Sequence, residues 1–213
     1  MRDSLLNTIH NPQPTTTIQE TRTVRISAKL DAHIRDLAMV GDQYRRWYFD
    51  SRDSIRDYCV AYDRDRQFTT DVIAIYSPRV QVSRNITFAK HFLETGEHPD
   101  GSLRARTAAA EHYVRTGKYT GRKVLAFADN LLNPETSQAV TVDTHVAKAY
   151  GVGSDFNDDQ FQAICRHITA IARTAKMLPH EIQAAIWCGR FRLELGREPE
   201  PFLDFSPSLD LIK

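Results

Sequence analysis

The sequence predicts an all-α protein, and three observations carry that prediction. Apolar residues recur at helical spacing through most of the 213-residue chain. Glycine and proline fall between the apolar-periodic segments, where helices must end. The one Val/Thr-rich extended run, residues 139–142, is short. With 41% hydrophobic and 26% charged residues, the composition is that of a globular domain. From the order of the segments we expect negligible strand content.

The first half of the chain is expected to form four helices. Residues 28–38, 42–62 and 69–76 carry apolar side chains at helical spacing. Pro78 stops the third of these segments, and a fourth helix then runs from Val82 to Thr95 and ends at Gly96.

The second half is expected to add five helices. After the turn-rich residues 96–102 come helices over 103–115 and 122–132. Another follows Asp143 and reaches Tyr150, and the last two lie within 157–177 and 178–196, the second opening on Pro179 and Glu181. We therefore divide the chain into a flexible N-terminal tail (1–22), one helical domain (23–196) and an irregular C-terminal tail (197–213).

Composition excludes several classes of protein. No run of about 18 apolar residues exists, so no membrane span is expected, and the first twenty residues lack the apolar core of a secretory signal. The three cysteines are odd in number and far apart, which favours a reducing cytoplasm over a disulfide framework. No CxxC or Cys/His cluster offers ligands for zinc or an iron–sulfur centre, so no cofactor is expected.

Charge is distributed unevenly along the chain. The net charge is only +1, but residues 79–123 hold nine Lys/Arg against four Asp/Glu. Arginine outnumbers lysine 21 to 7, and its planar guanidinium suits phosphate. This pattern fits either a nucleic-acid-binding face or solvated arginine-rich helices.

Lys123 and Asp143 are the two candidate catalytic residues. Lys123 opens an apolar-periodic helix just after Gly121, where a lysine is commonly a solvated head group. Asp143 precedes the segment Thr-His-Val-Ala, where an aspartate commonly caps a helix. The alternative interpretation is that the amine and the carboxylate meet in one site.

Two stretches around these residues resemble a known family. "YTGRKVLAFADNLL" (119–132) is similar to the second half of a helix-hairpin-helix motif, and "AVTVDTHVAKAYG" (139–151) resembles the stretch that carries the essential aspartate of the helix-hairpin-helix/GPD superfamily of DNA glycosylases, which includes endonuclease III. Lys123 matches the position of the nucleophilic lysine of its glycosylase/lyase members. The resemblance implies a two-lobed all-α glycosylase fold with the site in a cleft between the lobes, and the compact form resembles small proteins of bacteriophages and their hosts.

The resemblance extends over residues 70–195. Residues 71–90 look like the family's early helix and the turn whose side chain wedges into the duplex, which makes Arg79 the first wedge candidate and Gln81 the second. Residues 182–194 resemble its final core helix, in which we expect Trp187 to be a core residue. The candidate DNA-binding residues are Arg79, Gln81, Arg84, Lys118, Thr120, Gly121, Arg122, His145 and Arg190.

The implied function is base excision from DNA, with or without abasic-site lyase activity. Asp143 would stabilise the charge that develops on the sugar, and Lys123, its pKa lowered by burial and by Arg122, would attack C1′. The implied partner is double-stranded DNA, with no membrane and a monomer as the default, in a bacterial or phage-infected cytoplasm. Two alternatives stay open: modification or exchange of bases in phage DNA, and a non-catalytic DNA- or partner-binding protein. Lys118 and Tyr119, which replace the family's Pro-Gly, favour the second.

Overall fold

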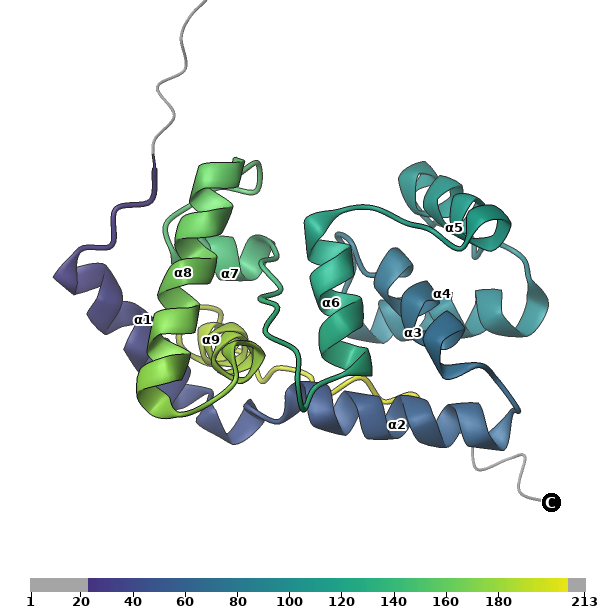
Figure 1. Cartoon of the computed structure of the whole chain (residues 1–213), viewed down its shortest axis with the longest axis horizontal. Helices are drawn as coiled ribbons and strands as arrows, with labels where there is room; N and C mark the ends of the chain where they lie inside the picture. Colours follow the sequence, from purple (N-terminus) through teal and green to yellow (C-terminus); the bar gives the residue numbers. More distant parts are fainter. Residues whose placement is uncertain (1–22, 207–213) are drawn as a thin grey trace, which may run out of the picture.

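The protein is all-α throughout the part that the structure describes. The computed structural model describes residues 23–206, so the expected N-terminal tail lies outside the described residues. Within that range no strand forms. The helices, shown in Figure 1, are α1 (Ala28–Val40), η1 (Asp42–Tyr44), α2 (Trp47–Ala61), α3 (Arg66–Tyr76), α4 (Val82–Thr95), α5 (Arg104–Thr116), α6 (Arg122–Leu132), α7 (Thr144–Ala149), α8 (Asp158–Ala175) and α9 (Pro179–Leu193). None of them is long and apolar enough to cross a membrane.

Helix ends follow the expected signals, with two differences. Gly96 and Gly117 end α4 and α5 in the left-handed conformation, as glycine does at many helix C-termini. The expected helix over 42–62 is split, because residues 42–44 form a 3-10 turn before α2 begins. Helix α3 starts three residues earlier than predicted, since the Asp65 carboxylate accepts a hydrogen bond from the Phe68 N–H and caps it.

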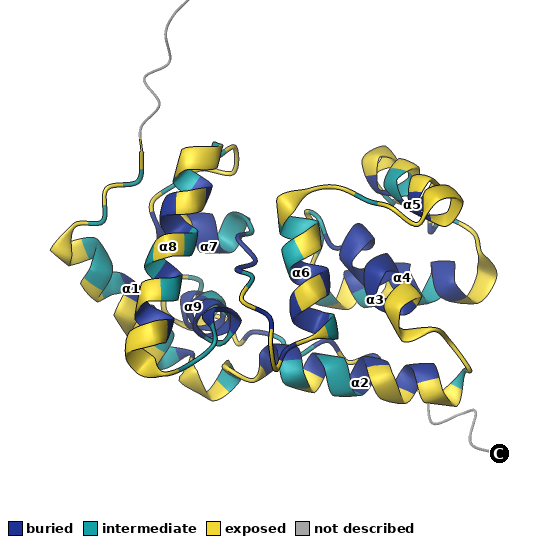
Figure 2. Cartoon of the chain, in the orientation of Figure 1, coloured by how far each residue is buried: buried dark blue, intermediate teal, exposed yellow. Residues whose placement is uncertain are grey.

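The helices bury their apolar faces in two clusters, visible as two groups of dark-blue ribbon in Figure 2. The first cluster is formed by helices α2, α3, α4, α5 and α6 and includes Tyr58, Tyr76 and Leu131. The second joins α1, α7, α8 and α9 and includes Ile164 and Ile186. The first cluster continues into α9 through two of its residues, and Trp187 packs against both clusters. Helix α9 therefore links the two groups.

A glycine pair lets α1 and α9 cross at backbone contact. A Cβ atom on Gly41 would lie 2.0 Å from the carbonyl oxygen of Ala185, and one on Gly189 would lie 1.9 Å from that of Leu37. No side chain fits at either position, because backbone atoms cannot move aside. The glycine of the Gly-Arg-Phe segment (189–191) is thus required by packing.

The segment after α9 is irregular, as expected, but it belongs to the domain. Leu203 and Phe205 are fully buried, and their N–H groups donate to Ser51 and Ser54 on α2. The Trp47 indole donates to the carbonyl oxygen of Glu200, further anchoring this strap (residues 197–206). The first cluster thus includes Leu203 and Phe205, which lie beyond residue 196, where the predicted helical domain ends.

Candidate functional site

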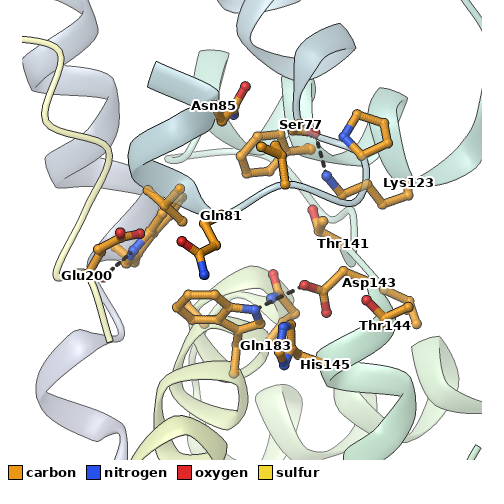
Figure 3. A pocket seen from close by; sticks show the side chains of 18 of the residues that line it. Ser77, Gln81, Asn85, Lys123, Thr141, Asp143, Thr144, His145, Gln183 and Glu200 are labelled. Carbon is orange, nitrogen blue, oxygen red and sulfur yellow. Dashed lines mark hydrogen bonds between the residues drawn. The ribbon is translucent and has the colours of Figure 1, made fainter. Parts of the chain in front are cut away.

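A pocket of about 710 Å³ opens between the two helix groups (Figure 3). Helices α2, α4 and α6 and the turn at 77–81 supply one side, and α7, α9 and the segment before α7 supply the other. Its size is within the range of small-molecule and cofactor pockets. Lys123 and Asp143 both line it, although twenty residues separate them in the chain.

The Lys123 amine is held on the α3 side of the pocket. Its Nζ donates to the Ser77 Oγ and lies 4.6 Å from the centroid of the Phe127 ring. The Ser77 hydroxyl donates its own proton to the Ala74 carbonyl oxygen at 2.8 Å, so its oxygen is free to accept from the lysine. Between the described side chains of Lys123 and Asp143 there is no hydrogen bond or ion pair.

The surroundings of Lys123 favour its neutral form. The pKa of the amine falls from 10.5 to about 8, mainly because burial among protein atoms disfavours the charged form; the Asp143 charge opposes this effect and the Arg106 charge adds to it. The sequence predicts that Arg122 shares in this effect, but its guanidinium is directed away from Lys123. It pairs with Asp158 and donates to the Phe156 carbonyl oxygen at 3.1 Å.

Asp143 is held at both carboxylate oxygens. As the N-cap of α7, its Oδ1 accepts from the Val146 N–H at 2.8 Å. Its Oδ2 accepts from the Trp187 indole Nε1–H at 3.0 Å, a contact drawn as a dashed line in Figure 3. Asp143 is thus both a helix cap and a pocket residue. Trp187 was expected to be a core residue; it is only partly buried and forms a wall of the pocket.

His145 faces the pocket as a neutral imidazole. The Arg190 Nη1 donates to its Nδ1 at 2.9 Å, so that nitrogen is an acceptor and the ring proton lies on Nε2. Burial lowers the pKa of His145, and the Asp143 charge only partly opposes this. Arg190 itself, a candidate DNA contact, is 8% exposed, also pairs with Glu194 at 2.7 Å, and does not line the pocket. Its role here is to support His145.

The turn between α3 and α4 forms the rim of the pocket. Arg106 is buried, and its Nε and Nη2 both donate to the Pro78 carbonyl oxygen, which fixes the turn from below. Arg79 has a φ of +56°, a conformation that costs a non-glycine residue free energy. Its exposed side chain lines the rim and makes no hydrogen bond or ion pair with a described residue. Gln81 instead extends over the pocket (Figure 3).

A buried carboxylate anchors the loop that leads to Lys123. Asp71 accepts hydrogen bonds of 2.6 Å from both the Tyr113 and Tyr119 hydroxyls, and its oxygens lie 3.0 Å from the Gln67 amide nitrogen. These contacts tie α5 and residues 117–121 to α3. Gly121, with a φ of +105°, then starts α6 without a side-chain cap. The first N–H groups of α6 are the kind that bind phosphate.

Buried polar groups line the deep end of the pocket. The Tyr48 hydroxyl donates to Gln183 Oε1 at 2.7 Å, and the Asn130 amide donates to Thr141 Oγ1 at 3.1 Å. Tyr48, Thr141 and Gln183 all line the pocket, alongside the aromatic rings of Trp47 and Phe127. The pocket therefore combines flat apolar walls with a few fixed polar groups, the pattern of a site for a planar polar ligand.

The candidate DNA-binding residues do not all reach this pocket. Those that line it are Arg79, Gln81, Gly121 and His145. Arg84, Lys118 and Thr120 are exposed outside it, with the Arg84 guanidinium over the Phe88 ring. In the described part of the chain, no group of three His, Cys, Asp or Glu residues is arranged to hold a metal ion.

Sequence reasoning missed Ser77, Arg106 and Trp187. Local patterns say little about them, since each acts on a residue more than twenty positions away. A serine directly after an apolar helix and before a proline was the one available signal.

Comparison with protein families matches residues 15–192 to a family of unknown function, DUF7178. The chain belongs to this family. The match includes both Lys123 and Asp143 and ends before the strap. Comparison with curated proteins and with solved structures found no match.

Proposed function

We propose that this protein excises a base from DNA, with Lys123 as nucleophile and Asp143 as the electrostatic partner, on a two-lobed helix-hairpin-helix glycosylase fold. One observation carries the proposal: an amine with a lowered pKa and a doubly held carboxylate, supplied by opposite sides, line one pocket. Both residues occupy the positions that the resemblance to the glycosylases assigns. A non-catalytic binding protein has no need of this pair.

The pocket walls suit an extruded nucleotide. A base in a duplex must leave the stack before its glycosidic bond can be reached. Trp187, Phe127 and Trp47 offer flat faces on which any base stacks, and the polar groups of Gln183 and Thr141 lie deeper. Gln81 and Arg79, at the rim, are the candidates to fill the space that the base leaves.

The chemistry assigned to the pair is balanced. A pKa of about 8 leaves roughly a tenth of the Lys123 amines neutral at pH 7. As the N–C1′ bond forms, the C1′–base bond breaks and its electron pair leaves with the base, which takes a proton from solvent. The amine proton passes to Asp143, whose charge has stabilised the oxocarbenium-like transition state. The proton on Asp143 then passes to O4′ as the C1′–O4′ bond breaks and the ring opens to a protonated imine. Loss of the C2′ proton to solvent forms the C2′–C3′ double bond, breaks the C3′–O bond and expels the 3′-phosphate.

Binding to the duplex is assigned to the rim of the pocket and to the exposed surface beside it. Arg79, Lys118 and the free N–H groups at the start of α6 are available to phosphate. We expect the affinity for duplex DNA to fall with salt at a log–log slope of about −0.9 per phosphate contacted. Salt-independent binding, or none at low salt, would favour the partner-binding alternative.

The test is a panel of duplexes, each with one damaged or modified base, incubated with the wild-type protein and with Asp143→Asn. Free base, detected by mass spectrometry, should appear from at least one duplex with the wild type only. Uptake of a labelled free base into the duplex would identify base exchange instead. Absence of both reactions across the panel would overturn the proposal.

A further inference from the structure

Trp187 makes the contact in the pocket that the proposed chemistry leaves unused. It is a half-buried side chain on α9 that packs against both hydrophobic clusters. Its ring centroid lies 4.4 Å from that of Phe191 and 6.4 Å from that of Trp47, so it is fixed on two sides. Its one polar atom, Nε1, donates to Asp143 Oδ2.

Two donors together determine how the carboxylate of Asp143 is oriented. The Val146 N–H on Oδ1 fixes one oxygen, but the group can still turn about that contact. The indole N–H on Oδ2 removes this freedom, and it approaches from a rigid ring. A hydrogen bond to an ionised acceptor is also stronger than one between neutral groups. A carboxylate aimed in advance stabilises a developing charge without reorganising first.

We propose, resting on the proposed function, that Trp187 is the positioning residue of Asp143 and that its ring is also the wall on which the extruded base stacks. One side chain then links the entry of the base to the orientation of the carboxylate. Trp187 touches the base and Asp143, while Asp143 alone stabilises the sugar charge.

The contact can be tested without any activity. The chain has two tryptophans, so its ¹H–¹⁵N spectrum has two indole signals, which Trp187→Phe assigns. Asp143→Ala removes the acceptor and should move the Trp187 indole signal upfield. The Trp47 indole donates to the Glu200 carbonyl oxygen at 3.0 Å, so its signal should stay in place and serve as the internal control.

The role is tested by single-turnover base release at saturating DNA. Trp187→Phe keeps an aromatic wall but removes the N–H, so the rate should fall by about 10- to 100-fold while the Kd for DNA changes by less than about threefold. Tyr150→Phe likewise removes one polar group from a buried ring, but Tyr150 is bonded to His167 outside the pocket, so its rate should stay close to that of the wild type. Because the N–H acts through Asp143, adding Trp187→Phe to Asp143→Asn should slow the reaction by no more than about twofold.

Each failure has its own signature. A wild-type protein that releases no base from any duplex overturns the proposed function and, with it, the catalytic sense of the contact. In an active protein, additive losses in the double variant overturn the positioning role alone. A Trp187 indole signal that does not move in Asp143→Ala also overturns the positioning role. This measurement remains informative even if Trp187→Phe fails to fold.

Discussion

The two sides of the pocket hold their charged groups in opposite ways. Asp143 receives a hydrogen bond on each oxygen, one from its own helix and one from Trp187, so its charged form is matched by donors. Lys123 has one neutral hydroxyl as its hydrogen-bond partner and lies beside an aromatic ring, with Arg106 as a repelling charge. The carboxylate thus has a hydrogen-bond donor for each oxygen, whereas the folded protein disfavours the charged form of the amine. An amine of this kind is more reactive for the same reason.

The largest effect on the rate of base release is expected from a change at Asp143. Asp143→Asn keeps a capping oxygen, because Asn is also a good N-cap, so the melting temperature should change little. It removes the charge that would stabilise the transition state, and base release should fall by about 10²- to 10³-fold. Single-turnover kinetics beside a melting curve measures both. A large fall in melting temperature would mean that Asp143 serves mainly as a cap.

The unfavourable environment of the Lys123 amine should lower the free energy of unfolding. Folding lowers the Lys123 pKa from 10.5 to about 8, so the unfolded chain binds this proton more tightly than the folded protein does. Below pH 8 the resulting cost is fully present, at most about 3 kcal/mol, and it is relieved as the pH rises from 8 to 10.5.

Lys123→Met should therefore unfold at a higher denaturant concentration than the wild type at pH 7. The difference should narrow as the pH is raised from 8 to 10, and chemical denaturation at several pH values measures it. A constant difference would mean that the lysine keeps its ordinary pKa in the folded protein.

A smaller effect is expected where Ser77 holds the amine. Ser77→Ala removes the hydrogen bond that Nζ makes among the described residues and should slow adduct formation by up to about tenfold, since the amine is no longer aimed. Thr87→Ala is the matched control, because the Thr87 hydroxyl also donates to a helix carbonyl but lies outside the pocket. Equal rates for the two variants would mean that Ser77 does not orient the Lys123 amine.

The smallest effect concerns the strap. The Glu200 Oε1 lies 3.3 Å from the Ser83 N–H, at the start of α4, where a DNA phosphate would otherwise meet a free donor. Glu200→Gln should raise the affinity for duplex DNA by about two- to fivefold at low salt, as fluorescence anisotropy can measure. Glu97→Gln, exposed and outside the pocket, is the control for a change in net charge alone.

Local signals predicted most of the fold and part of the site. Gly96, Gly117 and the cap at Asp143 fixed helix ends within a residue or two, because caps act over three or four positions. The burial of the strap was not predicted. Leu203 and Phe205 carry no periodic pattern, and they pack on a helix about 150 residues earlier in the chain.

Local sequence signals could not predict which side chains surround each candidate residue. The indole that holds Asp143 comes from a position 44 residues away, and the guanidinium that lies near Lys123 comes from α5 and not from the adjacent Arg122. Spacing in the sequence identifies which residues share a helix face, whereas these contacts depend on how two groups of helices meet.

The central claim, that Lys123 is the nucleophile, is tested most directly by borohydride trapping on a duplex with one abasic site. The wild type should form a covalent adduct, and peptide mapping should find it on Lys123. Lys148→Met, which removes an exposed lysine of α7 outside the pocket, should form the same amount, and Lys123→Met none. An adduct that persists in Lys123→Met, or no adduct with the wild type, would contradict the claim.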